Sequence, residues 1–258
     1  MRSPELQVNL NLVAKICTLR CNRIALDGLT QQGDHDDCLS NGPLPMIEEG
    51  ILAIWNDCKP GHRDAYEAWY QGEHLIERLA VPGFLRGRRY QAIDAMAPAF
   101  FTYYKTRTPD VLTTSAYRSR IDNPTPETAR IMSGIFCNMS RTVCRVTVRV
   151  GQMRGSVALT IKLAETPPMS DVLAGKDDDP GIARAELWEA AQETDLSVSC
   201  EETLRGEDDK ITACLSIETL REEVARKVMD NLSRRLAGAI NEAGIYRLLC
   251  ELTPETTS

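Results

Sequence analysis

The sequence predicts an α+β protein made of two tandem ferredoxin-like β-α-β-β-α-β units whose antiparallel sheets pack face to face as an α/β barrel. Two observations lead to this prediction. Runs typical of strands and stretches with helical spacing alternate along the chain, and both halves show them in the same order. A β-α-β-β-α-β unit places both helices on one face of its sheet, so the other face must be covered, and packing the two sheets together covers it.

The first predicted unit spans residues 47–150. Residues 50–56 form a mostly apolar run that indicates a buried strand. Residues 63–80 carry apolar side chains every three or four positions, and Pro82-Gly83 ends this helix. The remaining predicted elements are strands at 84–93 and 100–106, helical pieces at 109–121 and 125–138 divided by Asn123-Pro124, and an alternating strand at 141–150.

The second predicted unit spans residues 151–258 and repeats the order. Its predicted elements are a strand at 156–163, a loop at 165–179, a helix at 181–193, a hairpin of strands 196–203 and 211–217, a long helix at 221–243 and a strand at 245–252. Gly244 is predicted to cap the long helix, because glycine tolerates a positive φ.

Residues 1–46 differ in character from the rest. Weak periodicity is followed by a polar run at 30–37, and a strand pattern starts only near residue 50. We expect a disordered or non-native extension, with Met46 as an alternative first residue. An organelle-targeting segment is the other interpretation, although residues 2–23 lack the expected serines. The acidic cluster around His35 is expected to be a solvated loop rather than a metal site.

Composition excludes several classes of function. The chain has 258 residues, of which 43% are apolar and 26% charged, as in ordinary globular proteins. Its net charge of −7 disfavours nucleic acid as a partner. No apolar run reaches the roughly 18 residues that cross a bilayer, so no membrane partner is expected either.

The nine cysteines do not indicate zinc or disulfides. No CxxC pair occurs, and Cys17 and Cys21 have no matching second pair. Cys144 and Cys214 occupy strand positions where a thiol packs as a small apolar group. With no secretory signal, reduced thiols in a cytoplasmic protein are the expected state.

The motif that carries chemistry lies at the corner between the first helix and the second strand. Trp69, Tyr70, Glu73 and His74 stand on the helix, and Pro82-Gly83 leads into a strand that carries arginines. This is the one place in the sequence where titratable and cationic groups gather next to a predicted helix-to-strand corner. This arrangement predicts a small-molecule site.

These residues resemble a known family. The helix with Glu73-His74, the Pro82-Gly83 corner and the Arg88-Arg89-Tyr90 strand are similar to the pattern of EthD-like proteins of the dimeric α/β-barrel superfamily. Uncharacterised bacterial relatives resemble residues 115–117 and 123–125. The resemblance covers residues 50–150 and implies fold more than function. The second half matches only as a fold, because the helix predicted there has Trp188 but no Glu-His pair.

His74 is the predicted catalytic residue. An imidazole has an unperturbed pKa near 6.5, which suits a general base. Tyr70 at i−4 and Arg78 at i+4 share its helix face, and a nearby arginine would lower the pKa and favour the neutral form. A structural imidazole is the alternative interpretation. Glu73 is expected either to bind substrate or to pair with an arginine.

Arg86, Arg88 and Tyr90 alternate onto one face of the second strand, with Phe84 on the same face. Arg88 and Tyr90 are predicted to stabilise an oxyanion, and Arg86 to bind a substrate carboxylate, because a guanidinium binds a carboxylate through two hydrogen bonds. Structural pairing with Asp57 or Glu73 is the alternative. Other aromatic side chains are predicted to line a substrate cavity or to fill the core: Trp55, Trp69, Tyr70, Tyr103 and Tyr104.

No cofactor is predicted. His62 and His74 lack metal-ligand spacing, and only His74 could act as an axial haem ligand. The phosphate-binding glycine motifs and the GxSxG motif are absent from the sequence.

Two functions remain open from the sequence. The first is a cofactor-free cyclase, dehydratase or monooxygenase that acts on a small apolar oxygenated molecule, with His74 as general base. The second is a non-catalytic ligand-binding or assembly module in which Glu73, His74 and the arginines are structural. The chain is expected to be a monomer with a pseudo-dimeric barrel or a homodimer.

Overall fold

Eight antiparallel strands close into a barrel in the computed structural model, which describes residues 49–95, 98–167, 179–191 and 198–254. The order around the barrel is β1-β3-β2-β8-β5-β7-β6-β4. The strands are β1 (Gly50–Cys58), β2 (Phe84–Ala92), β3 (Phe100–Thr106), β4 (Phe136–Val150), β5 (Val157–Leu163), β6 (Ile182–Ala190), β7 (Ala213–Thr219) and β8 (Ile240–Leu252). The predicted fold class is confirmed.

Each half of the chain contributes one four-stranded sheet of the same topology. The first sheet has the order β4-β1-β3-β2 and the second the order β8-β5-β7-β6. Two seams join them, where β2 pairs with β8 and β4 pairs with β6. Because the two halves share one closed sheet, residues 46–258 form one compact unit. The division at residue 150 into two structural repeats stays a prediction.

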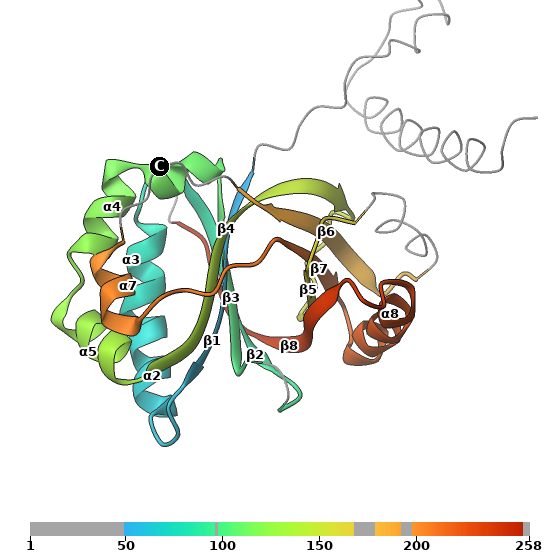
Figure 1. Cartoon of the computed structure of the whole chain (residues 1–258), viewed down its shortest axis with the longest axis horizontal. Coiled ribbons are helices and arrows are strands. Elements are labelled where there is room, and N and C mark those ends of the chain that lie inside the picture. The colour runs from blue at the N-terminus through green and yellow to red at the C-terminus, as the bar shows by residue number, and fades with distance from the viewer. Residues whose placement is uncertain (1–48, 96–97, 168–178, 192–197, 255–258) are drawn as a thin grey trace, which may run out of the picture. The chain divides into compact units, whose positions relative to one another are not determined.

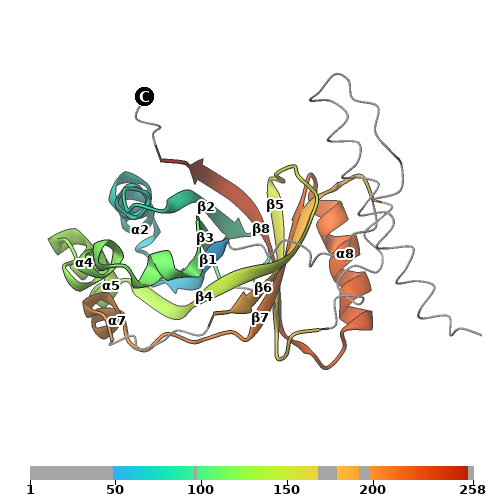
Figure 2. The same cartoon turned by 90° about the horizontal axis from the view of Figure 1, so that it is seen from above.

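The helices lie outside the barrel, and most of them cover the first sheet. Figures 1 and 2 show α2, α3, α4, α5 and α7 on the outer face of the first sheet, and α8 against the second. The helical segments are α2 (Arg63–Trp69), the π-helix η1 (Tyr70–His74), α3 (Leu75–Leu79), the 3₁₀-helix η2 (Pro109–Thr113), α4 (Ser115–Asp122), α5 (Pro126–Gly134), α7 (Cys200–Arg205) and α8 (Glu222–Arg235).

The elements of the first half match the prediction closely, with one difference. The predicted helix at 125–138 ends at Gly134, and β4 already begins at Phe136. Phe136 pairs with Cys58 of β1, so the sheet extends over residues that carry helical spacing. Thr114 and Thr125 cap α4 and α5 with their side chains, which is why these two helices begin where they do.

The second half corrects three predicted elements. Residues 181–193, predicted as a helix, contain strand β6 instead, and the predicted strand at 196–203 overlaps helix α7. Strands β6 and β7 pair in the sheet, but helix α7 separates them in the sequence, so they are not joined as a hairpin and the predicted hairpin is wrong. Both faces of β6 are buried, so it lacks the alternation that marks a half-exposed strand. Trp188 therefore lies on a strand. The comparison of its segment with the helix that carries His74 does not hold.

The long helix of the second half is shorter than predicted. Helix α8 ends at Arg235, and β8 begins at Ile240. Gly244 lies within β8, where it pairs with Thr160, so its predicted role as a helix cap is wrong. Gly238, with a φ of 92°, makes the turn that follows the helix.

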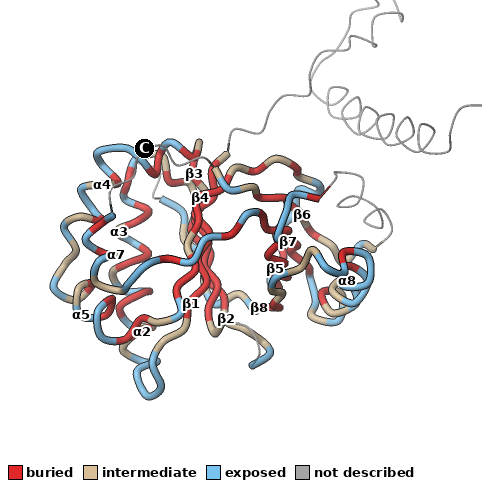
Figure 3. The backbone as a smooth tube through the Cα atoms, viewed as in Figure 1, coloured by how far each residue is buried: buried red, intermediate tan, exposed pale blue. Residues whose placement is uncertain are grey.

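Among the described residues, one buried cluster lies between the first sheet and its helices and another lies inside the barrel (Figure 3). On β1, Leu52 and Ile54 belong to the helix-facing layer, whereas Ala53 and Trp55 face the interior. This alternation fills the barrel with side chains, as is usual for eight strands. The aromatic interior residues include Trp55, Tyr90, Phe101, Tyr103, Trp188 and Tyr246.

Charged groups inside the barrel are paired. Glu218, which is 2% exposed, lies 2.7 Å from the Arg88 guanidinium and 3.0 Å from that of Arg154. Tyr103 donates a hydrogen bond of 2.8 Å to the same carboxylate, and the Gly155 N–H donates another of 3.0 Å. Arg88 also contacts Glu251 across the seam at 2.8 Å. This network connects the first sheet to the second.

The other sequence expectations are tested in part. Cys144 and Cys214 are buried in the barrel, and no disulfide joins the described cysteines. Burial raises the pKa of Cys214 to about 12, so this thiol stays protonated.

The expectations for residues 1–46, including Cys17, Cys21 and the His35 cluster, lie outside the described residues. In the part of the chain described here, no helix is long and apolar enough to cross a membrane.

We expect Arg88→Met to lower the free energy of unfolding by about 3 kcal/mol, because it takes a buried partner away from Glu218. Chemical denaturation measures this loss. Arg86→Met is the control: Arg86 pairs with Glu251 at the partly exposed seam, so its loss should cost less than about 1 kcal/mol. Adding Glu218→Gln to Arg88→Met should recover part of the stability. Equal losses in the two single variants would contradict this account.

Candidate functional site

The candidate site begins with an irregular turn in the helix that carries His74. Between α2 and α3 the chain forms the π-helix η1, and the Leu75 N–H donates its hydrogen bond to the Tyr70 carbonyl, five residues back. Such π turns occur often at functional sites. Five-residue spacing also lets Trp69 pack against His74, with ring centroids 4.4 Å apart and the rings tilted by 36°.

Gly87 lets this helix lie close to the sheet. A Cβ at this position of β2 would lie 2.7 Å from Leu75 Cδ1 and 3.2 Å from the ring of Tyr104. Two residues further along the strand, the Arg89 guanidinium lies 4.7 Å from the ring centroids of Tyr70 and Phe100. These contacts fix where Tyr70, one turn before His74, meets the sheet.

His74 is buried and neutral. Its side chain is 4% exposed, and its Nδ1 atom has no hydrogen-bond partner among the described residues. Burial, and then the positive charges of Arg78 and Arg205, hold the pKa of His74 well below 6.5. The predicted effect of Arg78 on the pKa of His74 is confirmed in direction. The imidazole is thus the unprotonated form that can accept a proton at neutral pH.

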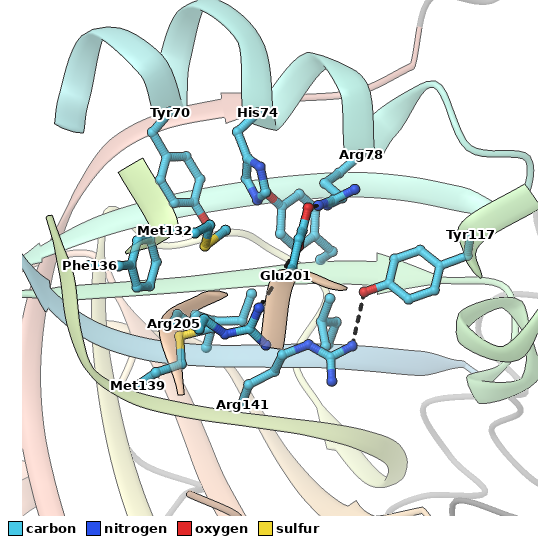
Figure 4. Close-up of a pocket in the computed structure, with 13 residues that line it drawn as sticks. Tyr70, His74, Arg78, Tyr117, Met132, Phe136, Met139, Arg141, Glu201 and Arg205 are labelled. Atoms are coloured by element: carbon cyan, nitrogen blue, oxygen red, sulfur yellow. Dashed lines mark hydrogen bonds and ion pairs between the residues drawn. The ribbon is translucent and has the colours of Figure 1, made fainter. Parts of the chain in front are cut away.

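A small cavity of about 20 Å³ lies between this helix and the sheet. That volume holds roughly one water molecule. Figure 4 shows Tyr70, His74 and Arg78 directed from the helix toward the sheet, with Glu201 of α7 beside them. The lining residues are Leu52, Ile54, Tyr70, His74, Arg78, Tyr104, Tyr117, Met132, Phe136, Met139, Arg141, Glu201 and Arg205.

One wall of the cavity is a buried ion-pair network that α7 supplies from the second half of the chain. Glu201 forms a close ion pair with Arg78 and lies 4.0 Å from Arg205. Arg205 also binds Asp208 at 2.7 Å, and Asp208 is buried. The side chain of Ser199 caps α7 by accepting a hydrogen bond from the Glu202 N–H. The first and second halves therefore both contribute to the site.

Three tyrosines and a third arginine complete the polar lining. Burial raises the pKa of Tyr70 and raises that of Tyr104 well above 10, so both hydroxyls stay protonated and can donate hydrogen bonds. Arg141 donates a hydrogen bond of 2.9 Å to the Tyr117 hydroxyl. The remaining walls are apolar, with two methionines and a phenylalanine among them.

The structure brings together four of the predicted site residues. The cavity is lined by three of them, His74, Tyr70 and Tyr104. The fourth, Trp69, packs against the imidazole of His74. Trp69 also donates a hydrogen bond of 3.0 Å to Thr128 of α5.

The other predicted site residues lie elsewhere. Arg88, Tyr90, Tyr103 and Trp55 face the barrel interior, on the opposite side of the sheet from His74. The alternation along β2 explains this placement, because the face that carries Gly87 is the one that meets the helix.

Two more predicted residues have structural partners. Arg86 pairs with Glu251 at 3.2 Å. A bulge after Phe84 places the Phe84 side chain on the helix side of β2, so it does not share the face of Arg88 as predicted. Glu73 accepts hydrogen bonds from Thr125 and Thr128, so it joins its helix to the start of α5. The arginine partner expected for Glu73 is replaced by two threonines.

Most of the residues that line the cavity are not predicted from the sequence. It identifies Arg78 only as a neighbour of His74, although the i+4 spacing already places it on the same face. Arg141 and the methionines give no signal beyond apolar or alternating patterns, and Tyr117 enters only through the resemblance of residues 115–117 to bacterial relatives. Glu201 and Arg205 escape notice because their segment is predicted as a strand, yet Ser199 followed by two glutamates is typical of a helix start.

The sequence matches no family model and no curated protein. Solved structures share the fold. An anthrone oxidase-like protein has a TM-score of 0.52 at 9% identity, covering 81% of this chain and 94% of that one. A chlorite dismutase mutant from Candidatus Nitrospira defluvii has a TM-score of 0.48 at 10% identity, covering 79% and 92%. A haem-binding protein from Thermus thermophilus has a TM-score of 0.44 at 9% identity, covering 79% and 92%.

The similarity to the anthrone oxidase-like protein, at 9% identity, shows a shared fold and nothing finer. The EthD-like resemblance of residues 50–150 stays a prediction.

Haem does not fit beside His74. Small-molecule sites occupy about 300–1,000 Å³, far more than the 20 Å³ here. The rings of Trp69 and Tyr70 also pack against the imidazole of His74. Among the described residues, no group of three histidine, cysteine, aspartate or glutamate side chains could hold a metal ion.

The lowered pKa of His74 predicts a stability that falls with acid. Between about pH 6.5 and the lower folded-state pKa, the unfolded chain binds a proton at His74 that the folded chain does not, so the free energy of unfolding rises with pH by up to about 1.4 kcal/mol per unit. Urea denaturation from pH 5 to 7 measures this slope. His74→Phe, which keeps a ring against Trp69, should reduce the slope, whereas His62→Phe at the exposed histidine should not. An unchanged slope in His74→Phe would show that His74 is not buried as a neutral group.

Proposed function

We propose that this protein is a cofactor-free enzyme that removes a proton from a small, mostly apolar, oxygenated molecule, with His74 as the general base. The observation that carries the proposal is the neutral imidazole, buried to 4% exposure, that lines a cavity with an Nδ1 atom unpartnered among the described residues. A buried imidazole nitrogen without a hydrogen-bond partner is costly for stability, and this cost is typical of a residue kept for its chemistry.

The surroundings of His74 fit removal of a proton from the carbon next to a carbonyl, or from the hydroxyl of a phenol. Removing such a proton leaves an enolate or phenolate, and the negative oxygen must be stabilised. Arg78 supplies a positive charge, and Tyr104 supplies a hydroxyl that stays protonated. These two residues take the oxyanion role that the sequence predicts for Arg88 and Tyr90, because they share the cavity with His74. The resulting anion could cyclise, lose water or react with oxygen, according to the substrate.

Substrate entry requires the cavity to enlarge. About 20 Å³ does not hold an organic molecule, but the wall contains side chains that can change rotamer. Met132 and Met139 are unbranched and flexible, and Glu201 lies on a helix of six residues. An apolar substrate would take the space of the methionines, with its oxygen toward Arg78 and Tyr104.

Hydrogen exchange at carbon tests the proposal. Anthrone has an acidic CH₂ group, and the anthrone oxidase-like protein of the same fold suggests it as a probe, together with acetylacetone and phenylpyruvate. In D₂O, the wild type should accelerate exchange of at least one probe above the buffer rate, measured by NMR. His74→Gln should reduce this acceleration by about 100-fold or more, because removal of a general base costs that much.

The controls separate catalysis from folding. His62→Gln changes the exposed histidine and should keep the wild-type rate, and near-UV circular dichroism should show that His74→Gln is folded. Exchange at equal rates in wild type and His74→Gln would refute the role of His74.

A second candidate function is a non-catalytic ligand-binding or assembly module. The small cavity and the paired charges of the barrel interior favour it. In this case the wild type accelerates exchange of none of the probes, and Glu73→Gln lowers the melting temperature by breaking the link to α5.

A further inference from the structure

Arg89 is a buried cation without a carboxylate partner among the described residues. It is 0% exposed, and none of its three guanidinium nitrogens has a hydrogen-bond partner there. The guanidinium lies among three aromatic rings, 4.7 Å from the centroids of Tyr70 and Phe100 and 5.1 Å from that of Tyr66. An arginine stays charged, and cation–π contacts offset only part of the cost of burying a charge. This cost indicates a role other than stability.

Tyr70 is the one of these three rings that also lines the His74 cavity. Its centroid lies 5.1 Å from that of the His74 imidazole, and Figure 4 shows both side chains directed from the helix toward the sheet. The Tyr66 hydroxyl, in contrast, exchanges hydrogen bonds of 2.9 and 3.2 Å with the Asn56 side chain, and Tyr66 does not line the cavity. The charge of Arg89 therefore acts on the cavity through Tyr70.

The phenols of Tyr70 and Tyr104 differ in how readily they release a proton. Burial raises the pKa of Tyr70, but the neighbouring hydroxyls of Thr102 and Tyr104, and then the charge of Arg89, offset part of this rise. Burial also raises the pKa of Tyr104, and the neighbouring Tyr70 raises it further, to well above 10. A general acid works best when its pKa lies near the operating pH. Tyr70 is therefore the better proton donor of the two.

We propose that Tyr70 is the general acid of this site, that Arg89 is the positioning residue that stabilises its phenolate, and that the protein interconverts the keto and enol forms of a small carbonyl compound. This inference rests on the proposed function and deepens it by naming the reaction class.

The two proton transfers balance without a further reactant. His74 accepts the proton from the carbon next to the carbonyl, and the electrons of that C–H bond form the C=C bond of the enol. The π electrons of the C=O bond take up the hydroxyl proton of Tyr70, which leaves a phenolate against the Arg89 guanidinium. The imidazolium then returns its proton to the phenolate beside it. The site is thereby restored, and nothing is oxidised or reduced.

The ultraviolet absorbance of the enol tests the reaction class. The keto and enol forms of phenylpyruvate and of acetylacetone absorb differently, and both directions of the interconversion use the same groups. The wild type should accelerate the interconversion of at least one probe above the buffer rate. Tyr70→Phe, which keeps the ring against Arg89, should reduce this acceleration by about 100-fold or more. The control Tyr246→Phe removes a hydroxyl inside the barrel, on the other face of the sheet, and should keep the wild-type rate.

The role of Arg89 is tested through Tyr70. Arg89→Met should slow the interconversion by about 3- to 10-fold, because proton donation becomes slower as the pKa of the acid rises. Arg89→Lys keeps the charge and should recover part of the rate. In a Tyr70→Phe background, Arg89→Met should slow the reaction no further, whereas a purely structural Arg89 would slow both backgrounds equally. If Arg89→Met does not fold, Arg89→Gln should give the same slowing.

The outcomes distinguish this inference from the proposed function. If the wild type accelerates exchange at carbon through His74 but not keto–enol interconversion, the inference fails and the proposed function stands. The same holds if folded Tyr70→Phe interconverts the probes at the wild-type rate. Equal slowing by Arg89→Met with and without the Tyr70 hydroxyl would overturn the role of Arg89. A wild type that accelerates neither exchange nor interconversion would overturn both the inference and the proposed function.

Discussion

The main-chain pairing of β2 with β8 and of β4 with β6 is the constraint on which the rest of this structure depends. These seams make two sheets into one closed surface with an inside and an outside. Every strand residue must then face either a packed interior or a layer of helices. On β2, Arg88 and Tyr90 face inward, whereas Gly87 and Arg89 face the helix. Adjacent residues of β2 therefore face opposite sides of the sheet, one toward the interior ion pairs and the next toward the helix of His74.

Each of the two polar regions has a buried carboxylate with cationic partners. Inside the barrel, Glu218 receives two guanidinium groups, a phenol and a backbone N–H, which satisfies a carboxylate that cannot reach water. Beside His74, Glu201 pairs closely with Arg78, and Arg205 binds Asp208. The Nδ1 atom of His74, by contrast, has no hydrogen-bond partner among the described residues. This unpartnered nitrogen is why we place the proposed chemistry on the helix side of the sheet.

How well the sequence predicts each element depends on how distinctive its residue types and their spacing are. The structure matches the elements predicted in residues 50–106. Strands β1 and β3 are rich in isoleucine or aromatic residues, which are typical of strands, and the helix between them has apolar side chains every three or four positions. Strand β6 is also buried on both faces, but it is rich in alanine and contains two glutamates, so its pattern resembles a helix until pairing with β4 and β7 decides it. His74 and its neighbours at i±4 are visible in the sequence because helix geometry alone places them together. Glu201 is not, since it lies far from His74 along the chain and only the fold joins them.

Strand β8 is the last strand of the barrel in chain order, and this affects how the molecule is made. A ribosome that has finished β4 has released a four-stranded sheet with two bare edges, β2 and β4, and with aromatic side chains on its open face. Bare edges are the sites at which sheets join wrong partners. The edge of β4 is covered once β6 emerges, but the edge of β2 waits for β8. The barrel therefore cannot close before β8 has left the ribosome, and until then the β2 edge and the aromatic face are open to aggregation.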